Sequence, residues 1–273
     1  MGLGVSAEVT LGAAWLAPHD LTWAGVALLL LAALAAGFVD AVVGGGGLIQ
    51  LPALLLVPGM SPVQALATNK LGGVFGTATS SVTFYRRVRP DPGTFTPMAV
   101  LAGLGSVAGA ACASLLPAAV FRPIILLALV AVAAYTLATP TLGERTALRY
   151  AGHRHVVVAA LAGAAIGFYD GILGPGTGSF LVFALVGLLG YAFLEASATA
   201  KIVNFATNLG ALGFFAVHGS VLWGLGIAMG LANMTGSYLG ARTAIGAGNR
   251  FVRVFFLVVV GALIARLGWQ LAA

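Results

Sequence analysis

Long apolar segments, separated by short polar loops, make up most of this chain. Segments 23 to 39, 123 to 138 and 254 to 269 approach or reach the roughly 20 apolar residues with which an α-helix spans a bilayer. Because such segments recur, the pattern predicts an all-α, polytopic membrane protein. Residues 1 to 20 lack the basic start, apolar core and small-residue cleavage site of a signal peptide, so we expect them to remain as a short lead outside the membrane.

The pattern also repeats. GFVDAVVGGGG at 37 to 47 is echoed by GFYDGILGPGTG at 167 to 178, and each is followed by a segment with a T-x-K triplet, ALATNKLGGVFGTA or ASATAKIVNFATNL. Three pairs of residues keep a near-constant offset: Asp40 and Asp170 at 130 (170 − 40), Lys70 and Lys201 at 131 (201 − 70), and Ser106 and Ser237 at 131 (237 − 106). This constancy indicates an internal duplication. Ser106 and Ser237 lie in SVAGA and SYLGA, which we interpret as small-residue packing faces.

Each repeat is predicted to hold an interrupted apolar region followed by three transmembrane helices. The second piece of the first interrupted region has about 10 residues before Pro58, too few to cross as a helix, which indicates a half-helix or a re-entrant hairpin. The predicted parts are a lead at 1–20, a first repeat at 21–139, a linker at 140–153 and a second repeat at 154–273. The interrupted regions are 21–57 and 155–190, and the spans are 63–85, 95–117, 120–139, 196–218, 221–242 and 251–271.

Arginine placement predicts the orientation. Nine arginines lie in three polar segments, which the positive-inside rule places in the cytoplasm. With that constraint the first interrupted region starts and finishes outside and the second starts and finishes inside, so both are hairpins. The two repeats then have opposite orientation, as in many secondary transporters. The arginines are Arg86, Arg87 and Arg89, then Arg145, Arg149 and Arg154, then Arg242, Arg250 and Arg253.

Composition supports a lipid environment. Of the 273 residues 60% are hydrophobic and 7% are charged, whereas an ordinary soluble domain has about a quarter charged. The 39 glycines lie among Leu, Val and Ala, which fits close helix packing and broken helices. The net charge of +6 is explained by membrane orientation, so no nucleic-acid partner is predicted. Cys112 is the only cysteine, which excludes an intramolecular disulfide and a cysteine-rich metal site.

Four charged residues lie inside apolar segments: Asp40, Asp170, Lys70 and Lys201. The two lysines are the only ones in the chain, and they occupy equivalent places in the two repeats. Placing an ionisable residue within the membrane costs free energy, so such a residue normally faces protein or water and has a functional partner. We interpret the lysines as part of an anion site. The alternative is that each lysine snorkels to the interface from a helix end.

Polar donors accompany the lysines. Asn69 precedes Lys70, and Asn204 and Asn208 share one helix face with Lys201 because they follow it at i+3 and i+7. The glycine clusters can break a helix and aim backbone N–H groups at a negative ligand. Discontinuous helices at corresponding places in two repeats are typical of a transporter's binding site.

Asp40 and Asp170 need another role, because a carboxylate repels an anion. Each can pair with a lysine or cap a broken helix. Alternatively, each can take up a proton that compensates the charge of the substrate. The sequence leaves both roles open.

The sequence gives little support for a metal site, a nucleotide-binding loop or an enzyme active site. His153 and His155 flank Arg154 in the polar linker and His19 and His218 are isolated, so no metal site is predicted. GPGTGSF lacks the GK[ST] ending of a phosphate-binding loop, and no catalytic cluster emerges. We therefore expect no cofactor and no enzymatic activity.

The paired motifs GFVDAVVGGGGLIQLP with ALATNKLGGVFGTATSSVTFYRR, and GFYDGILGPGTGSF with ATAKIVNFATNLGAL, resemble the sulfite exporter TauE/SafE family over about 24 to 271. The resemblance implies passage of small anions, especially sulfite, sulfoacetate and related sulfur-containing acids, across the bacterial inner membrane. The sequence departs from the symmetric pattern at Ala200, opposite Asn69. The family's motif segments fall here on Gly44–Gln50, Thr68–Lys70, Gly174–Thr177 and Thr199–Lys201. The predicted substrate-binding residues are Gly45, Gly46, Gly47, Gln50, Thr68, Asn69, Lys70, Gly176, Thr177, Lys201, Asn204 and Asn208.

Together these features predict a secondary transporter that holds a small anion near the bilayer midplane between the repeats and works by alternating access. An anion channel would share the charges but would need a continuous polar pore. A membrane enzyme or scaffold would need a catalytic cluster or a large soluble surface, and neither is visible. The sequence leaves open which anion is carried and in which direction, whether a proton is coupled, and whether the chain forms a homodimer.

Overall fold

A computed structural model describes residues 22–113 and 143–272 of the chain. Within these two ranges the chain is helical and has no strand, which confirms the all-α prediction. Five of the helices are long and apolar enough to cross a membrane. The predicted lead at 1–20 and the predicted span at 120–139 lie outside the described residues.

Each predicted interrupted region is a pair of helices separated by a glycine-containing break. In the first range the helices are α2 (Trp23–Val43), α3 (Gly47–Leu55), α4 (Pro62–Val88) and α5 (Pro92–Cys112). In the second range they are α7 (Gly152–Ile172), α8 (Thr177–Phe183), a π-helix η1 (Ala184–Leu189), α9 (Phe193–Val217) and α10 (Trp223–Ala272). The predicted spans 221–242 and 251–271 both fall in α10, which bends where Gly248 has a φ of 73°.

Local sequence signals set the starts of α4 and α5. Ser61 accepts from the Gln64 backbone N–H and the Gln64 side chain accepts from the Ser61 N–H, forming a capping box with Pro62 at the first helical position. Asp91 caps α5 by accepting from the Gly93 N–H at 3.1 Å. These signals end the preceding loops and start helices where the apolar pattern resumes.

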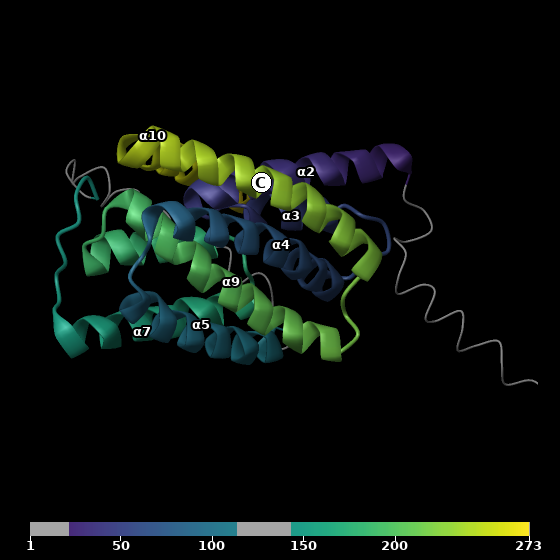
Figure 1. The fold of residues 1–273 in the computed structure, drawn as a ribbon. Helices are drawn as coiled ribbons and strands as arrows, with labels where there is room; N and C mark the ends of the chain where they lie inside the picture. The colour runs from purple at the N-terminus through teal and green to yellow at the C-terminus, as the bar shows by residue number, and fades with distance from the viewer. Residues whose placement is uncertain (1–21, 114–142, 273) are drawn as a thin grey trace, which may run out of the picture.

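The two broken hairpins enter from opposite ends of the molecule and meet at its centre. In Figure 1, α2 begins at the right end and α7 begins at the left end. At the meeting point the Ser179 N–H donates to the Gly44 carbonyl at 3.1 Å and the Ser179 hydroxyl donates to the Val43 carbonyl at 3.0 Å. A Cβ on Gly44 would overlap the backbone of Gly178. Only glycine allows the two hairpin tips to approach this closely.

The first helix of each hairpin packs against a helix of the other half. Gly37 of α2 lies against the Asn233 carbonyl of α10, and Gly167 of α7 lies against the Ala102 carbonyl of α5. The Ser237 hydroxyl in SYLGA donates to the Gly37 carbonyl at 3.1 Å, which places this motif in a packing seam as predicted. Small residues let helix backbones approach closely in lipid. The two halves are therefore interlocked, because the first helix of each hairpin packs against a helix of the other half.

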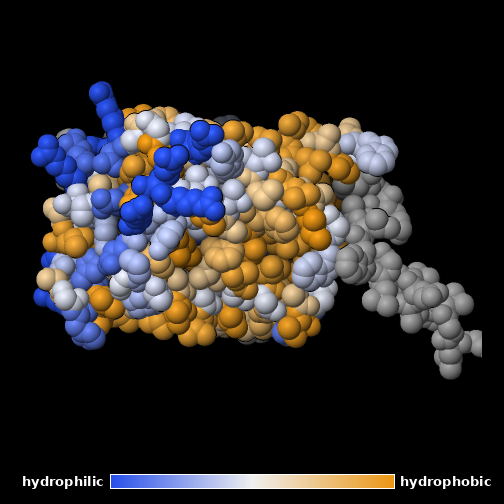
Figure 2. Space-filling view, in the orientation of Figure 1, coloured by the Kyte–Doolittle hydropathy of each residue, from blue (hydrophilic) through white to orange (hydrophobic). Residues whose placement is uncertain are grey.

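Hydrophilic residues gather at one end of the molecule, the left end in Figure 2, where α4 ends and α7 begins in Figure 1. The end of the linker packs there, because the Ala147 N–H donates to the Gly190 carbonyl at 2.8 Å. Assigning His155 to the polar linker was wrong. It is buried in α7, 3.1 Å from both the Thr94 and the Tyr191 hydroxyl oxygens, and burial raises the pKa of Tyr191.

Candidate functional site

The first helix break positions Asp40 and a set of backbone N–H groups. Gly44 ends α2 in the left-handed region with a φ of 85°, and its N–H donates to the Asp40 carbonyl at 2.7 Å. The chain then turns within three residues and α3 begins at Gly47. The Gly46 N–H points to the Asp40 carboxylate at 3.4 Å, so this carboxylate caps the break. The Gly47 N–H has no hydrogen-bond partner among the described residues.

The second helix break, between α7 and α8, is built in the same way. Gly174 and Gly176 have φ values of 82° and 85°, a conformation in which a residue with a side chain would be strained. Asp170 accepts from the Thr177 hydroxyl at 2.6 Å and thereby fixes the start of α8. Within the described ranges the Gly178 N–H, like that of Gly47, lacks a partner. Each break thus combines a carboxylate with an unpaired backbone donor.

The two lysines cross between the halves. Lys70 of α4 lies with its Nζ 2.7 Å from Asp170 Oδ2, and Lys201 of α9 lies with its Nζ 3.1 Å from Asp40 Oδ2. The Lys201 ammonium also donates to the Asp40 carbonyl. Each lysine therefore reaches from its own half to the helix break of the other half.

Burial rules out the snorkelling alternative for both lysines. The exposed fraction of the side chain is 1% for Lys70 and 0% for Lys201. Because neither ammonium is exposed to bulk water, each depends on its carboxylate partner. Removing one partner of a buried pair leaves an uncompensated charge and costs about 3–5 kcal/mol. The two pairs therefore hold the halves together in this conformation.

A small polar cavity lies where the two breaks meet. Its volume is about 30 Å³, which is room for one or two water molecules. Lys70, Asp40 and Asp170 reach the cavity, whereas Lys201 does not line it. The lining consists of Asp40, Gly44, Gly46, Gly47, Gln50, Asn69, Lys70, Gly73, Thr77, Asp170, Gly174, Thr177, Gly178, Asn204, Asn208 and Asn233.

Side-chain amides form most of the remaining polar wall. Gln50 is 1% exposed, and its carbonyl oxygen accepts from the Asn233 amide at 2.8 Å. The other end of the Gln50 amide has no partner among the described residues and lies against Gly72 of α4. Asn208 lies close to Gly73, where a Cβ would sit 3.1 Å from the Asn208 Oδ1. A buried amide group without a partner costs about 1–3 kcal/mol, so the free end of the Gln50 amide is poised to bind a polar ligand.

The structure brings most of the predicted site residues to this cavity. Those that line it, besides the two aspartates, are Gly46, Gly47, Gln50, Asn69, Lys70, Thr177, Asn204 and Asn208. Gly45, Thr68, Gly176 and Lys201 lie outside the lining. Thr68 accepts from the Leu222 N–H at 3.2 Å, and a Cβ on Gly45 would lie 3.0 Å from Val259, so both have packing contacts.

The predicted site residues omit six that line the cavity: Gly44, Gly73, Thr77, Gly174, Gly178 and Asn233. Gly44 and Gly174 lie within the family's motif segments. The repeat offset of 131 contained a signal for two of them, because Gly73 is equivalent to Asn204 (204 − 73) and Thr77 to Asn208 (208 − 77). Asn233 precedes Ser237 by one helical turn, and the two side chains lie 3.2 Å apart. Its polar character inside an apolar helix was the available signal.

The charges around the cavity balance. Two lysines and two aspartates sum to zero, and both carboxylates already have ammonium partners. An anion entering here must compete with a carboxylate for an ammonium or bring a compensating proton. Lys70 is the lysine that faces the cavity, so it is the ammonium within reach. Among the described residues no group of three or more His, Cys, Asp or Glu side chains is arranged to hold a metal ion.

Comparison with known proteins gives a consistent result along almost the whole chain. A family model described as "Sulfite exporter TauE/SafE" matches residues 29–267. The "Probable membrane transporter protein ORF9" of Sinorhizobium sp is 38% identical over 249 residues, which is 91% of this chain and 94% of that protein. The "Probable membrane transporter protein YfcA" of Escherichia coli strain K12 is 35% identical over 88% of both chains. A "Probable membrane transporter protein" of Haemophilus influenzae is 34% identical over 89% of this chain and 96% of its own length. No solved structure gives a significant match.

Proposed function

Because the chain belongs to the sulfite exporter TauE/SafE family and is therefore a multi-pass membrane transporter, we propose that it carries small anions across the bacterial inner membrane by alternating access. The favoured substrates are sulfur-containing acids such as sulfite or sulfoacetate. This is an activity of transport and not of chemical conversion, which agrees with the family.

The observation that carries the proposal is the position of Lys70. Its buried ammonium faces the central cavity and touches the helix break of the opposite half, with Asp170 as its resting partner. An anion that displaces the Asp170 carboxylate gains a charge-assisted hydrogen bond from the ammonium. The Gly47 and Gly178 N–H groups and the asparagine amides supply neutral donors around it. In this conformation the cavity has room for only one or two water molecules, so it must widen when an anion binds.

The two lysines have different roles in this proposal. Lys201 is held by both the carbonyl and the carboxylate of Asp40 and does not line the cavity, so it serves as a fixed tie between the halves. Lys70 has a single ion-pair partner and is the ammonium that exchanges between Asp170 and the substrate. The duplication thus supplied two equivalent lysines, of which one binds the anion.

The interlocked arrangement supports alternating access. Substrate sites of such carriers lie at the interface of two repeats, between broken helices. Here the tips of the hairpins meet at Gly44 and Gly178 and close the centre from both ends. We propose that breaking the Lys70–Asp170 pair loosens this contact and lets one half rock against the other. The channel alternative would need a continuous polar path, and currents far above carrier rates in electrical recordings would favour it.

The direct test is a binding screen. Purified protein would be titrated with sulfite, sulfate, sulfoacetate and small carboxylates while its thermal unfolding is followed. A ligand that binds the folded state raises the unfolding temperature by mass action. We expect a shift for a sulfur-containing anion in the wild type and none in Lys70→Ala. Retained binding and uptake in proteoliposomes by Lys70→Ala would refute the site.

A further inference from the structure

A second cavity lies away from the central site, between the C-terminal part of α4 and the first part of α10. Its volume is about 410 Å³, which is within the range of small-molecule sites. Its wall combines three arginines, one tyrosine and a few apolar or small residues. The lining residues are Val82, Thr83, Arg86, Arg87, Tyr238, Arg242, Ile245 and Gly246.

The cavity has a strong positive charge. No carboxylate lines it, and within the described parts of the chain none of its three arginines forms an ion pair. Arg86 and Arg87 lie in the last turn of α4, where cations also favour the helix dipole. Arg242 lies in α10 six residues before the break at Gly248 (248 − 242), outside the last turn in which the helix dipole acts. A ligand-binding role accounts for all three.

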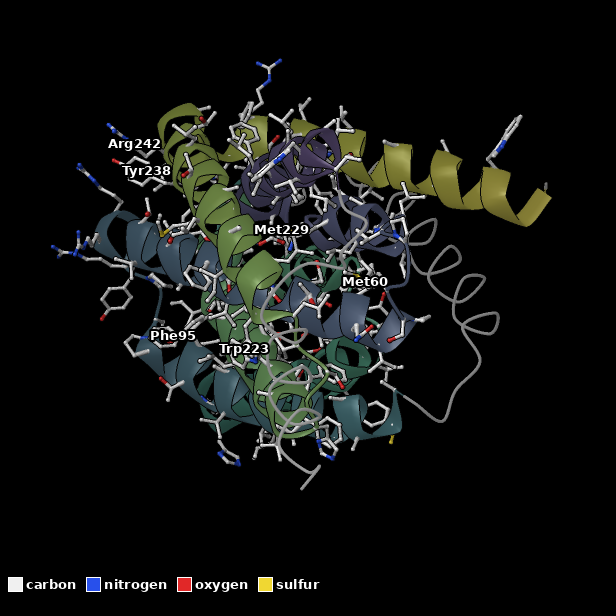
Figure 3. The ribbon with its side chains drawn as sticks, turned by 90° about the vertical axis from the view of Figure 1, so that its right-hand side faces the viewer. Met60, Phe95, Trp223, Met229, Tyr238 and Arg242 are labelled. Carbon is white, nitrogen blue, oxygen red and sulfur yellow. The ribbon has the colours of Figure 1, made fainter. Side chains whose placement is uncertain are left out.

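Tyr238 holds Arg242 in place. The Arg242 guanidinium donates to the Tyr238 hydroxyl oxygen at 3.1 Å and lies 5.5 Å from the ring centroid. Figure 3 shows the two side chains close together at one edge of the molecule. Tyr238 takes only one of the five guanidinium N–H donors, so the others remain available to a ligand. A positioned arginine of this kind suits bidentate binding of a phosphate.

The cavity lies at the boundary between the apolar and hydrophilic surfaces. Val82 is 51% exposed and Leu239 is 48% exposed, whereas Arg86 and Arg87 lie in the last turn of α4, which ends at the hydrophilic end of the molecule (Figures 1 and 2). The positive-inside rule places this end in the cytoplasm. Basic pockets between transmembrane helices on that side are suited to anionic lipid head groups.

We propose that this cavity binds the phosphodiester head group of an anionic phospholipid from the cytoplasmic leaflet. Arg86, Arg87 and Arg242 hold the phosphate, and Val82 and Ile245 contact the glycerol and the start of the acyl chains. Free phosphate has the same charge chemistry. The exposed apolar residues beside the cavity favour the lipid, because they gain nothing from a fully polar anion.

A bound lipid would also connect the two halves. α4 belongs to the first half and supplies Lys70 to the central site, whereas α10 belongs to the second half and supplies Asn233. A head group held by arginines of both helices stabilises their present contact. This inference stands apart from the proposed transport activity, because lipid binding is measured without a transported substrate.

The experiment compares lipids and arginine variants on the full chain. Delipidated protein in neutral detergent would be titrated with phosphatidylglycerol or phosphatidylcholine, and bound lipid counted by native mass spectrometry. We expect phosphatidylglycerol to bind the wild type and the triple variant Arg86→Gln, Arg87→Gln, Arg242→Gln to bind it about tenfold or more weakly. Arg154→Gln is the matched control, because Arg154 stacks over Tyr150 at 5.0 Å but lies outside the cavity lining.

Three outcomes would overturn the proposal. Equal binding of phosphatidylglycerol by the wild type and the triple variant would exclude the arginines, and equal binding of phosphatidylcholine would exclude charge recognition. Displacement of the lipid by inorganic phosphate at equal concentration would identify a free-anion site instead. The single variant Arg242→Lys keeps the charge but loses the planar fork, so we expect an intermediate loss. Unfolding temperatures measured in phosphatidylcholine check that every variant is folded.

Discussion

Lys70 Nζ and Asp170 Oδ2 lie 2.7 Å apart, although 100 residues separate them in the chain (170 − 70) and they belong to opposite halves. The same arrangement holds in reverse for Lys201 and Asp40. The two helix breaks are thus connected by reciprocal ion pairs. Because a buried pair adds little net stability, we infer that its benefit is specificity of arrangement together with a cation that can be exchanged.

Replacing Lys70 with methionine should separate stability from binding. The variant leaves Asp170 buried without a cation, so we expect it to lose about 3–5 kcal/mol of stability. The double variant Lys70→Met, Asp170→Asn removes both charges and should recover most of that loss, because no uncompensated charge remains. Anion binding should stay absent in both. Thermal unfolding and binding titrations measure the two effects, and binding by the double variant would contradict the role of Lys70.

The equivalent change at Lys201 should behave differently. Lys201→Met leaves Asp40 unpaired and should destabilise the protein by a similar amount, about 3–5 kcal/mol. The double variant Lys201→Met, Asp40→Asn should recover stability and also keep most of its anion binding, because Lys201 does not line the cavity. Equal loss of binding in the two double variants would show that both lysines hold the anion.

The sequence predicted the helical class, the two interrupted regions and most of the cavity wall. This was possible because burying charge in lipid is expensive, so Asp40, Lys70 and their equivalents stand out in an apolar chain. The internal repeat doubled that signal. It also identified the broken segments, because glycine clusters recur at the same places.

The sequence did not predict which lysine pairs with which aspartate. Within one half, Asp40 and Lys70 are 30 residues apart (70 − 40), and nothing in their spacing excludes a local pair. The cross-pairing arises from the meeting of two hairpins, which is a tertiary relationship. The same reason explains why Asn233 was missed, since its contact with Gln50 spans 183 residues. His155 was misplaced because the buried hydroxyl groups that contact it, those of Thr94 and Tyr191, are distant in the sequence.

Asp170→Asn should distinguish pairing from proton coupling. In our proposal Asp170 pairs with Lys70 and caps the break through Thr177, so the variant should transport more slowly and be less stable. Its response to an imposed pH gradient should match that of the wild type, because the carboxylate does not carry a transported proton. Uptake into proteoliposomes with and without the gradient measures this ratio. Loss of the gradient response, with slow transport retained, would assign Asp170 the coupling role.

Cysteine labelling should test the orientation. Single cysteines at positions 88 and 147, introduced after Cys112→Ser, lie in two of the arginine-containing regions. The positive-inside rule places both positions in the cytoplasm, so an impermeant thiol reagent should label them in inverted vesicles and not in intact cells. Labelling of either position from outside would overturn the predicted topology and with it the cytoplasmic lipid site.

Gly44→Ala should disrupt the meeting of the hairpins. Gly44 has a φ of 85°, and a Cβ there would overlap the backbone of Gly178, so the variant combines strain with a collision. Gly59→Ala is the matched control, because Gly59 has a φ of 75° and nothing lies within 4 Å of its added Cβ. The control should cost about 1–2 kcal/mol, the usual penalty of a left-handed residue. Gly44→Ala should cost clearly more in thermal unfolding and should also abolish transport. Similar losses in the two variants would mean that backbone strain alone is important, and that the close contact of the hairpin tips is not required.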